Sequence, residues 1–189
     1  MGEDLQKKIR TDCWDKALDS FGYSYIYSKK IESLSKLLRW TKVLGILIPV
    51  LLGALLTSYI SNKELLDLAI YITTPIAIAQ LILSTYLTII GADERANSYS
   101  IKSAEYSLLN SEFEYLAKFP PADDIIFQNK YEVLLERERG ISKTNNEVSD
   151  KELRMGMRFG LRNYRRACAG CQKTPTSMIA TDCDVCGNF

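Results

Sequence analysis

Two long runs of uncharged residues dominate the pattern of polar and apolar positions along the chain. The first run extends from Val43 to Asn62 and has 20 residues, and the second extends from Leu68 to Ala92 and has 25. Only the sequence KELLD separates them. Because a helix needs about 20 apolar residues to cross the hydrocarbon core of a bilayer, the runs predict a transmembrane hairpin with spans of about 41–61 and 67–91.

Two other interpretations fit the runs less well. A secretory signal lies within roughly the first 30 residues and has a shorter apolar region, whereas the first run begins at Val43. A soluble protein would have to surround both helices with apolar side chains, and the rest of this 189-residue chain offers few of them. The mean hydropathy of -0.09 hides the runs, because it averages them with charged flanks.

The charges beside the runs predict the orientation of the hairpin. The approach to the first run contains one acid, Glu32, and several basic residues: Lys29, Lys30, Lys36, Arg39 and Lys42. Lysine and arginine near a span favour the cytoplasmic side, and acids count for little. We therefore expect a multi-pass protein of the inner (cytoplasmic) membrane with both termini in the cytoplasm. Trp40 and Tyr59 stand near the ends of the first span, where aromatic rings prefer the headgroup level.

Helical periodicity precedes the first run. Apolar residues recur every four positions over 5–21, and a second stripe follows over 27–38. These stripes predict a helix with a break or bend at Gly22. The alternation over 21–27 also fits a strand, but the sequence offers no evident partner strand.

A heptad-like stripe follows the second run and predicts another helix. Its members are Tyr99, Tyr106, Leu109, Phe113 and Leu116. Pro120 and Pro121 should stop this helix at Phe119. Because both spans return to the same side of the membrane, we expect this stripe and the one over 27–38 to pack together as a stalk, or against a neighbouring subunit.

Two shorter helices complete the chain. The first is expected over 123–139, with Gly140 closing it. A polar linker over 142–149 follows, and a last helix should begin near Ser149 as its cap and run to about Arg166. The fold class is therefore an all-α membrane protein: a two-transmembrane domain over 1–120, cytoplasmic helices and linker over 121–166, and a small cysteine-containing tail over 167–189.

Polar residues inside the second span form the first candidate site. The row consists of Thr74, Gln80, Ser84 and Thr88. Lipid cannot satisfy these groups, so we expect them to face protein or water, with Gln80 pointing inward. They are candidates for a pore-lining or assembly face of a homo-oligomer, and the alternative is hydrogen bonding that holds one hairpin together. Pro49 and Pro75 lie inside the spans and can kink them.

Four cysteines form a more specific motif: Cys168, Cys171, Cys183 and Cys186, spaced C-x2-C, eleven residues, C-x2-C. Two intervening residues let both sulfurs of a turn face one ion, and four thiolates suit tetrahedral zinc. A full set of protein ligands indicates a structural site, because catalytic zinc keeps a position for water. Iron–sulfur and disulfide interpretations stay open, although a reducing cytosol disfavours disulfides. So short a module needs its metal to fold, and Cys13 is expected to be a small core residue.

A basic row on the last helix is the third candidate: Arg154, Arg158, Arg162, Arg165 and Arg166. Guanidinium groups match phosphate oxygens, so this row is a candidate site for a nucleotide, a nucleic acid or anionic lipid. The alternative is a solvated helix face paired with acids such as Glu132, Glu136 and Glu138.

Composition argues against an enzyme. The chain has no histidine, which removes the commonest general base and metal ligand. No nucleophile–base pair, glycine-rich phosphate loop or paired carboxylate set is evident. The net charge of +1 creates no global attraction to nucleic acid.

The order of a cytoplasmic helix, a tight two-span hairpin and a long returning helix over about 1–120 resembles the SLATT family of bacterial conflict systems. The spacing from Cys168 to Cys186 resembles that of mobile-element proteins known by this CxxCx(11)CxxC pattern. The SLATT resemblance implies a membrane effector that assembles and perforates or depolarises the membrane when an upstream sensor detects phage or a nucleotide signal. Many such effectors carry a sensor domain, and none is recognisable in this sequence. We therefore expect the tail to receive the signal or to serve as a docking surface.

Overall fold

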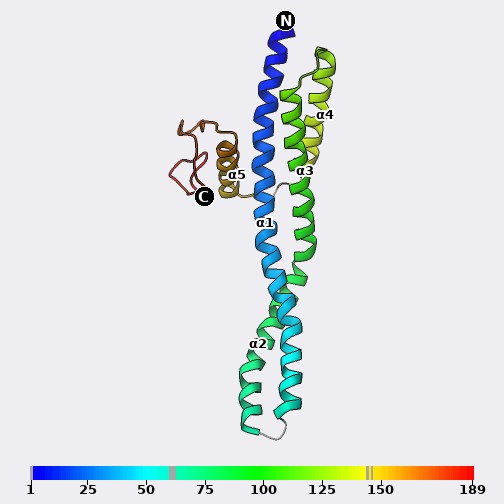
Figure 1. Cartoon of the computed structure of the whole chain (residues 1–189), viewed down its shortest axis with the longest axis vertical. Helices are drawn as coiled ribbons and strands as arrows, with labels where there is room; N and C mark the ends of the chain where they lie inside the picture. The colour runs from blue at the N-terminus through cyan, green and yellow to red at the C-terminus, as the bar shows by residue number, and fades with distance from the viewer. Residues whose placement is uncertain (1, 60–62, 144, 146) are drawn as a thin grey trace. The chain divides into compact units, whose positions relative to one another are not determined.

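The computed structural model describes residues 2–59, 63–143, 145 and 147–189, and this part of the chain is helical with an irregular tail. The helices are α1 (Gly2–Tyr59), α2 (Lys63–Ile89), α3 (Ala92–Lys118), α4 (Asp124–Ser142) and α5 (Asp150–Asn163), as Figure 1 shows. The described residues include no strand, so the strand interpretation of 21–27 is wrong and that segment lies within α1. Residues 60–62, at the predicted turn, and 144 and 146, in the predicted linker, lie outside the described part.

Contacts divide the chain into two units. The hairpin unit is Lys30–Ser98, and the core unit combines Met1–Lys29 with Tyr99–Phe189. Each unit is described by itself below. The predicted division at residues 120 and 166 stays a prediction.

The hairpin unit contains most of the apolar sequence. Both α1 and α2 include a window long and apolar enough to cross a membrane, and only 6% of each window is buried within the chain. A soluble core would cover these side chains, so the structure gives no support to a buried hairpin inside one chain. Pro49 and Pro75 lie inside α1 and α2 and end neither helix.

A small cluster joins the elements of the hairpin unit. Leu38 of α1 is buried with Leu87 and Ala92 at the junction of α2 and α3. The junction itself depends on Gly91, whose φ of 63° lies in the left-handed region that favours glycine. Its N–H donates to the carbonyl oxygen of Thr88 at 3.1 Å. The second apolar helix therefore ends at Ile89, slightly before the predicted limit.

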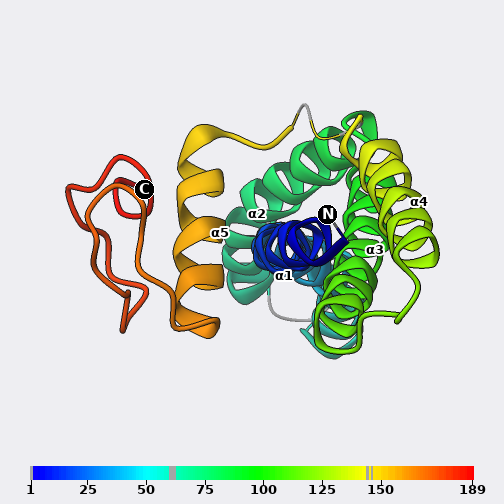
Figure 2. The same cartoon turned by 90° about the horizontal axis from the view of Figure 1, so that it is seen from above.

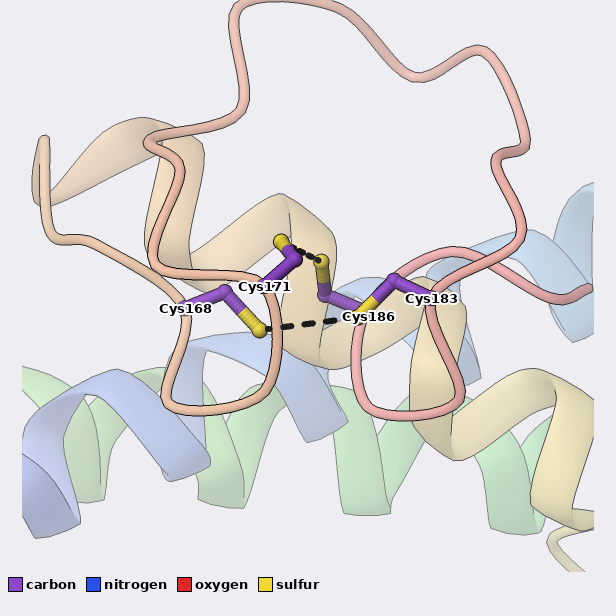
Figure 3. A group of neighbouring side chains, drawn as sticks. All are labelled: Cys168, Cys171, Cys183 and Cys186. Carbon is purple, nitrogen blue, oxygen red and sulfur yellow. Dashed lines mark hydrogen bonds between the residues drawn. The ribbon is translucent and has the colours of Figure 1, made fainter.

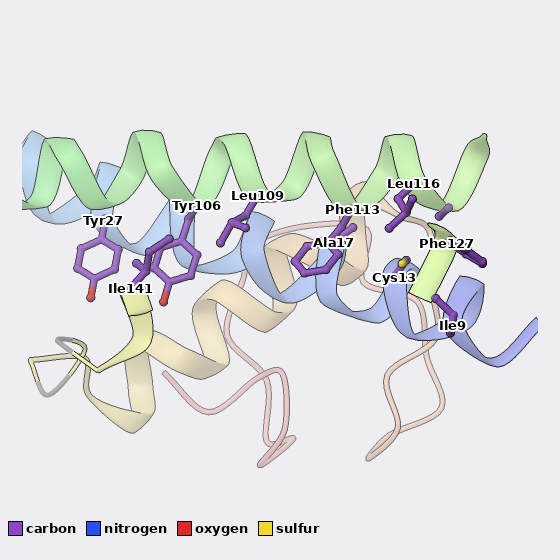
Figure 4. Packing of buried hydrophobic residues seen from close by; sticks show 11 residues of the cluster. Ile9, Cys13, Ala17, Tyr27, Tyr106, Leu109, Phe113, Leu116, Phe127 and Ile141 are labelled. Carbon is purple, nitrogen blue, oxygen red and sulfur yellow. The ribbon is translucent and has the colours of Figure 1, made fainter. Parts of the chain in front are cut away.

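Most of the predicted stripe over 27–38 lies in the hairpin unit. The core unit buries the stripe from Tyr106 to Leu116 and most of the one over 5–21, in which Leu5 is exposed. Its central cluster, shown in Figure 4, brings together residues of α1, α3 and α4: Ile9, Cys13, Ala17, Tyr27, Tyr106, Leu109, Phe113, Leu116, Ala117, Phe127 and Ile141. Tyr27 of α1 stacks on Tyr106 of α3 with ring centroids 6.0 Å apart. Cys13 is fully buried, and this burial raises the pKa of its thiol to about 12. It is a core residue, as predicted.

Three predicted helix boundaries differ in the structure. The helix α1 passes through Gly22 without a break, because Gly22 serves a close contact with α5, described below. The helix α4 continues past Gly140 to Ser142, which places Ile141 in the core cluster. The helix α5 ends at Asn163, three residues before Arg166.

Candidate metal centre

The helix α5 carries the tail, and its start is fixed by a capping box. The Ser149 side chain accepts a hydrogen bond from the N–H of Glu152, and the Glu152 carboxylate accepts one from the N–H of Ser149 at 2.8 Å. Both bonds satisfy amides that the first helical turn leaves without partners. The predicted cap at Ser149 is therefore confirmed.

Glycines let α5 approach α1 closely. Gly156 and Gly160 lie one turn apart on α5, and a Cβ on Gly22 of α1 would come within 2.9 Å of the Gly156 carbonyl oxygen. A Cβ on Gly160 would come within 3.0 Å of the Leu18 carbonyl oxygen. Next to this contact, Phe159 stacks on Tyr25 with ring centroids 3.8 Å apart. Backbone therefore meets backbone, and α5 lies between α1 and the C-terminal tail (Figure 2).

The chain turns sharply at the end of α5. Arg165 has a φ of 51°, and the N–H of Arg166 donates to the Leu161 carbonyl oxygen at 3.0 Å. This 6→1 bond and the left-handed residue before it form a Schellman motif, which ends the helix and satisfies its last carbonyls. The turn explains why the helix stops early and directs the tail back along α5.

The tail forms two similar turns, each closed by the residue after its second cysteine. In the first turn, the N–H of Gln172 donates to the Cys168 carbonyl oxygen at 2.8 Å. In the second turn, the N–H of Gly187 donates to the Cys183 carbonyl oxygen, also at 2.8 Å. Each pair of cysteines is thus presented by the same type of backbone turn.

Gly187 is required for space. A Cβ at this position would lie 2.0 Å from Oγ1 and 2.6 Å from the carbonyl oxygen of Thr181. The closeness follows from the N–H of Thr181, which donates to the Gly187 carbonyl oxygen at 2.9 Å. This position therefore needs a residue without a Cβ, whereas Gln172 fills the equivalent position of the first turn with a φ of 55°.

The four sulfur atoms converge on one point (Figure 3). All lie within 4.8 Å of one another. The sulfurs of Cys168 and Cys183 are 3.9 Å apart, as are those of Cys171 and Cys186. A metal with four sulfur ligands at about 2.3 Å in tetrahedral geometry places its sulfurs about 3.8 Å apart. The observed spacing therefore fits one tetrahedral ion, and it is too long for a disulfide, whose sulfurs lie about 2.05 Å apart.

Backbone amides lie close to two of these cysteines. The N–H of Gly170 donates to the sulfur of Cys168 at 3.4 Å. Hydrogen bonds from the backbone N–H groups of Cys186 and Val185 lower the pKa of Cys183 to about 7. Burial has the opposite effect at Cys186 and raises the pKa of its thiol. A cation would compensate the burial of a Cys186 thiolate, so the four residues can hold a metal ion.

The surroundings of the sulfurs are apolar on the side of α5. Cys168 and Cys186 are buried in a cluster with Leu161 of α5 and Leu18 of α1. Four protein ligands leave no position for a substrate in a tetrahedral ion, and this favours a structural role. The sequence identified all four cysteines, because both turns are local.

The predicted basic row is divided by the structure. Arg158 is buried and donates to carbonyl oxygens of the tail, and Arg154 donates to the Asn188 carbonyl oxygen at 3.0 Å. Arg166 forms an ion pair with Asp15 of α1. Arg162 and Arg165 are exposed. Binding of an anion by this row stays a prediction, and the contact of Arg158 with the tail is one that the sequence did not reveal.

The acids proposed as partners of that row have other contacts. Glu136 pairs with Arg139 and Glu138 with Lys16, while Glu132 accepts a hydrogen bond from Gln128.

The polar row of α2 is also divided. The hydroxyls of Thr74 and Thr88 donate to carbonyl oxygens of their own helix, those of Ile70 at 2.7 Å and of Ser84 at 2.9 Å. Gln80 lies against α1, since a Cβ on Gly45 would come within 2.9 Å of its Nε2. Ser84 is half-buried. A role of these residues in a pore or assembly face stays a prediction.

A comparison with protein-family models gives one identification. The family described as Mobilome CxxCx(11)CxxC protein matches residues 10–189. No curated protein and no solved structure matches the chain. The match includes both apolar helices as well as the cysteine tail, whereas the resemblance to the SLATT family stays a prediction. Since the match extends over nearly its whole length, this chain belongs to the Mobilome CxxCx(11)CxxC protein family.

Proposed function

We propose that this chain is a small two-span effector that assembles with copies of itself and perforates or depolarises the bacterial inner membrane in phage defence or mobile-element conflict. The observation that carries the proposal is the exposure of its apolar helices. Ile46 of α1 is 71% exposed and Leu81 of α2 is 67% exposed. Soluble proteins rarely expose contiguous apolar patches larger than a few hundred Å², so lipid or further subunits must cover these faces.

The polar groups of the hairpin are compatible with lipid. Hydroxyls of Thr57, Thr74 and Thr88 each donate to a carbonyl oxygen of their own helix. A hydroxyl bonded in this way carries little penalty in a hydrocarbon environment, where unsatisfied polar groups are costly. Trp40, at the start of the first apolar run, is exposed and has the amphipathic ring that suits the headgroup level.

Orientation and biological setting rest on different arguments. The basic residues before the first span support an orientation with both termini in the cytoplasm, by the positive-inside rule. The family name connects the chain with mobile elements, and the resemblance of its sequence to SLATT effectors supports the proposed membrane-disrupting activity. An upstream sensor protein, a nucleotide or a nucleic acid would then be the trigger, with the tail or its basic row as the receiving part.

We assign zinc to the four cysteines, in a structural role. Thiolate ligands and tetrahedral spacing suit zinc better than the harder ions magnesium and calcium, which prefer oxygen ligands. The ion would hold the two cysteine turns together, because the tail has no helix or strand of its own among its described residues. Metal analysis of the purified chain should give one zinc per protomer.

A depolarisation assay tests the proposed activity. Induced expression in bacteria carrying a potential-sensitive dye should collapse the membrane potential. A variant with Leu at positions 74, 80, 84 and 88 should insert but leave the potential intact, because the polar row of α2 is gone. Thr57→Val, which removes a hydroxyl of α1 outside the row, is the matched control and should act like the wild type. An intact potential with wild-type protein present in the membrane, its trigger supplied, contradicts the proposal.

A second candidate function is a membrane-anchored metal-binding adaptor that contacts a nucleic acid or a partner protein. The position of Gln80 against Gly45 favours it, since the most polar residue of the row is then used within one hairpin. An adaptor should tolerate leucine at all four positions of the row without loss of function. The same variant therefore separates the two functions.

A further inference from the structure

Arg158 of α5 is a charged side chain in a buried position. Arg158 is only 7% exposed, and it is the only charged residue that is buried among the described residues. Its Nε donates to the Ser177 carbonyl oxygen at 2.7 Å, and its Nη1 donates to the Cys186 carbonyl oxygen at 3.2 Å and to Thr181 Oγ1 at 3.4 Å. All three acceptors are neutral. Arginine is rarely buried unless an anion accompanies it, because a desolvated charge without a counter-charge is strongly destabilising.

The acceptors all belong to the tail that carries the cysteines. Cys186 is one of the four metal-ligating candidates, and Thr181 closes the second turn through its bond to Gly187. Four thiolates around one divalent ion carry a net charge of about −2. The group packs against Leu161 and Leu18, where a low local dielectric leaves charges poorly screened. The loaded metal group is thus the anion that the buried guanidinium lacks.

We propose that Arg158 is the positioning residue of the metal centre: its charge compensates the anionic metal–thiolate group, and its fork holds the second cysteine turn on α5. The inference rests on the metal centre assigned above. Arg154, one turn earlier on α5, supports the same turn through the Asn188 carbonyl oxygen. The arginine row predicted to bind an external anion therefore includes one member, Arg158, whose counter-charge would be the metal–thiolate group of the same chain.

The fork matters as well as the charge. Nε and Nη1 reach two carbonyl oxygens nine residues apart in the tail, and a lysine ammonium cannot reproduce this planar arrangement. Groups that orient metal ligands commonly change metal affinity 10–100-fold when they are replaced. We expect an effect of this size from Arg158→Gln and a smaller one from Arg158→Lys, which keeps the charge and loses the fork.

The test is a zinc-affinity measurement on the purified 189-residue chain in detergent, by competition with a chelator of known affinity. Arg158→Gln should raise the apparent Kd about 10–100-fold, while Lys151→Gln, which removes one charge from an exposed position of the same helix, should change it less than about twofold. An equal Kd for Arg158→Gln and Lys151→Gln overturns the proposal. If the wild type itself binds no zinc, the metal centre is wrong and the role of Arg158 fails with it.

Folding is measured separately, so that a general loss of structure is not mistaken for loss of metal. Circular dichroism should give the wild-type helix content for all three variants. Addition of zinc should raise the melting temperature of the wild type more than that of Arg158→Gln, because binding energy adds to stability only as far as the ion is bound. If Arg158→Gln does not fold, the comparison passes to Arg158→Lys, for which an unchanged zinc affinity and an unchanged zinc-dependent shift overturn the proposal.

Discussion

Replacement of glycine by alanine should have opposite effects on stability at Gly22, where α1 contacts α5, and at Gly140 of α4. An alanine at Gly22 would place its Cβ 2.9 Å from the oxygen and 3.0 Å from the carbon of the Gly156 carbonyl. Both are backbone atoms, so no flexible side chain can move aside and α5 must shift as a whole. At Gly140, in the last turn of α4, an added Cβ meets no atom within 4 Å.

The magnitudes follow from two competing terms. Alanine is favoured over glycine in a helix interior by about 1 kcal/mol. Overpacking costs about 1–3 kcal/mol, and a rigid backbone contact belongs to the upper part of that range. The net change is then a loss of about 1–2 kcal/mol for Gly22→Ala and a gain of at most about 1 kcal/mol for Gly140→Ala, since Gly140 lies in the last turn of its helix.

Thermal unfolding of the purified chain, followed by circular dichroism, measures both effects. For a protein of this size, 1 kcal/mol corresponds to about 2–4 °C in melting temperature. Gly22→Ala should therefore melt about 2–8 °C lower than the wild type, and Gly140→Ala at most about 4 °C higher. If Gly22→Ala is as stable as Gly140→Ala, α5 does not contact α1 through its glycines, and the position of α5 on α1 loses its support.

Three further predictions concern the cysteines and their turns. Cys183→Ser should reduce bound zinc from one per protomer to a small fraction, measured by atomic emission, whereas Cys13→Ala should leave zinc unchanged; equal zinc in Cys183→Ser and the wild type contradicts the site. Gly187→Ala should weaken zinc binding at least tenfold, because its Cβ would lie 2.0 Å from Thr181 Oγ1, and wild-type affinity in this variant argues against the second turn. Burial raises the pKa of Cys13 to about 12, so at pH 8 an alkylating reagent should modify this thiol in denaturant but barely in the folded protein; rapid labelling of the folded state refutes its burial.

Much of the molecule was predictable because its signals are local. The cysteine turns depend on residues no more than four positions apart, and the stripe from Tyr106 to Leu116 repeats within one helix. Asp123 caps α4 through its own next turn, where its side chain accepts from the N–H of Ile125 at 2.8 Å. Such features need no knowledge of distant parts of the chain.

The errors concern residues whose partners are distant in sequence. Gly22 suggested a break by its propensity, but its contact is Gly156, and tertiary packing overrides a cost of about 1 kcal/mol. Gly140 suggested a helix end, but burial of Ile141 in the core cluster extends α4 by another two residues. The contact of Arg158 with the tail was likewise missed, because its residue type alone cannot reveal a carbonyl oxygen 28 positions away; anion binding by the basic row stays a prediction.

The division of the basic row changes the expectation for external ligands. Arg162 and Arg165 are exposed, whereas Arg154, Arg158 and Arg166 have contacts within the core unit. An anionic lipid or a nucleotide would therefore meet, near the end of α5, two guanidinium groups that have no partner among the described residues, rather than a continuous row of five.

The central claim is that the two exposed apolar helices cross the inner membrane with the tail in the cytoplasm. Site-specific labelling of intact cells with a membrane-impermeant thiol reagent tests it most directly, using Lys63→Cys at the start of α2 and Lys143→Cys at the end of α4. The cell wall and outer membrane are first made permeable to the reagent, with the inner membrane left intact. The account predicts that the cysteine at 63 is labelled in these cells and that the cysteine at 143 is labelled only after the inner membrane is opened. Labelling of position 143 before opening, or of neither position until opening, contradicts the hairpin and its orientation.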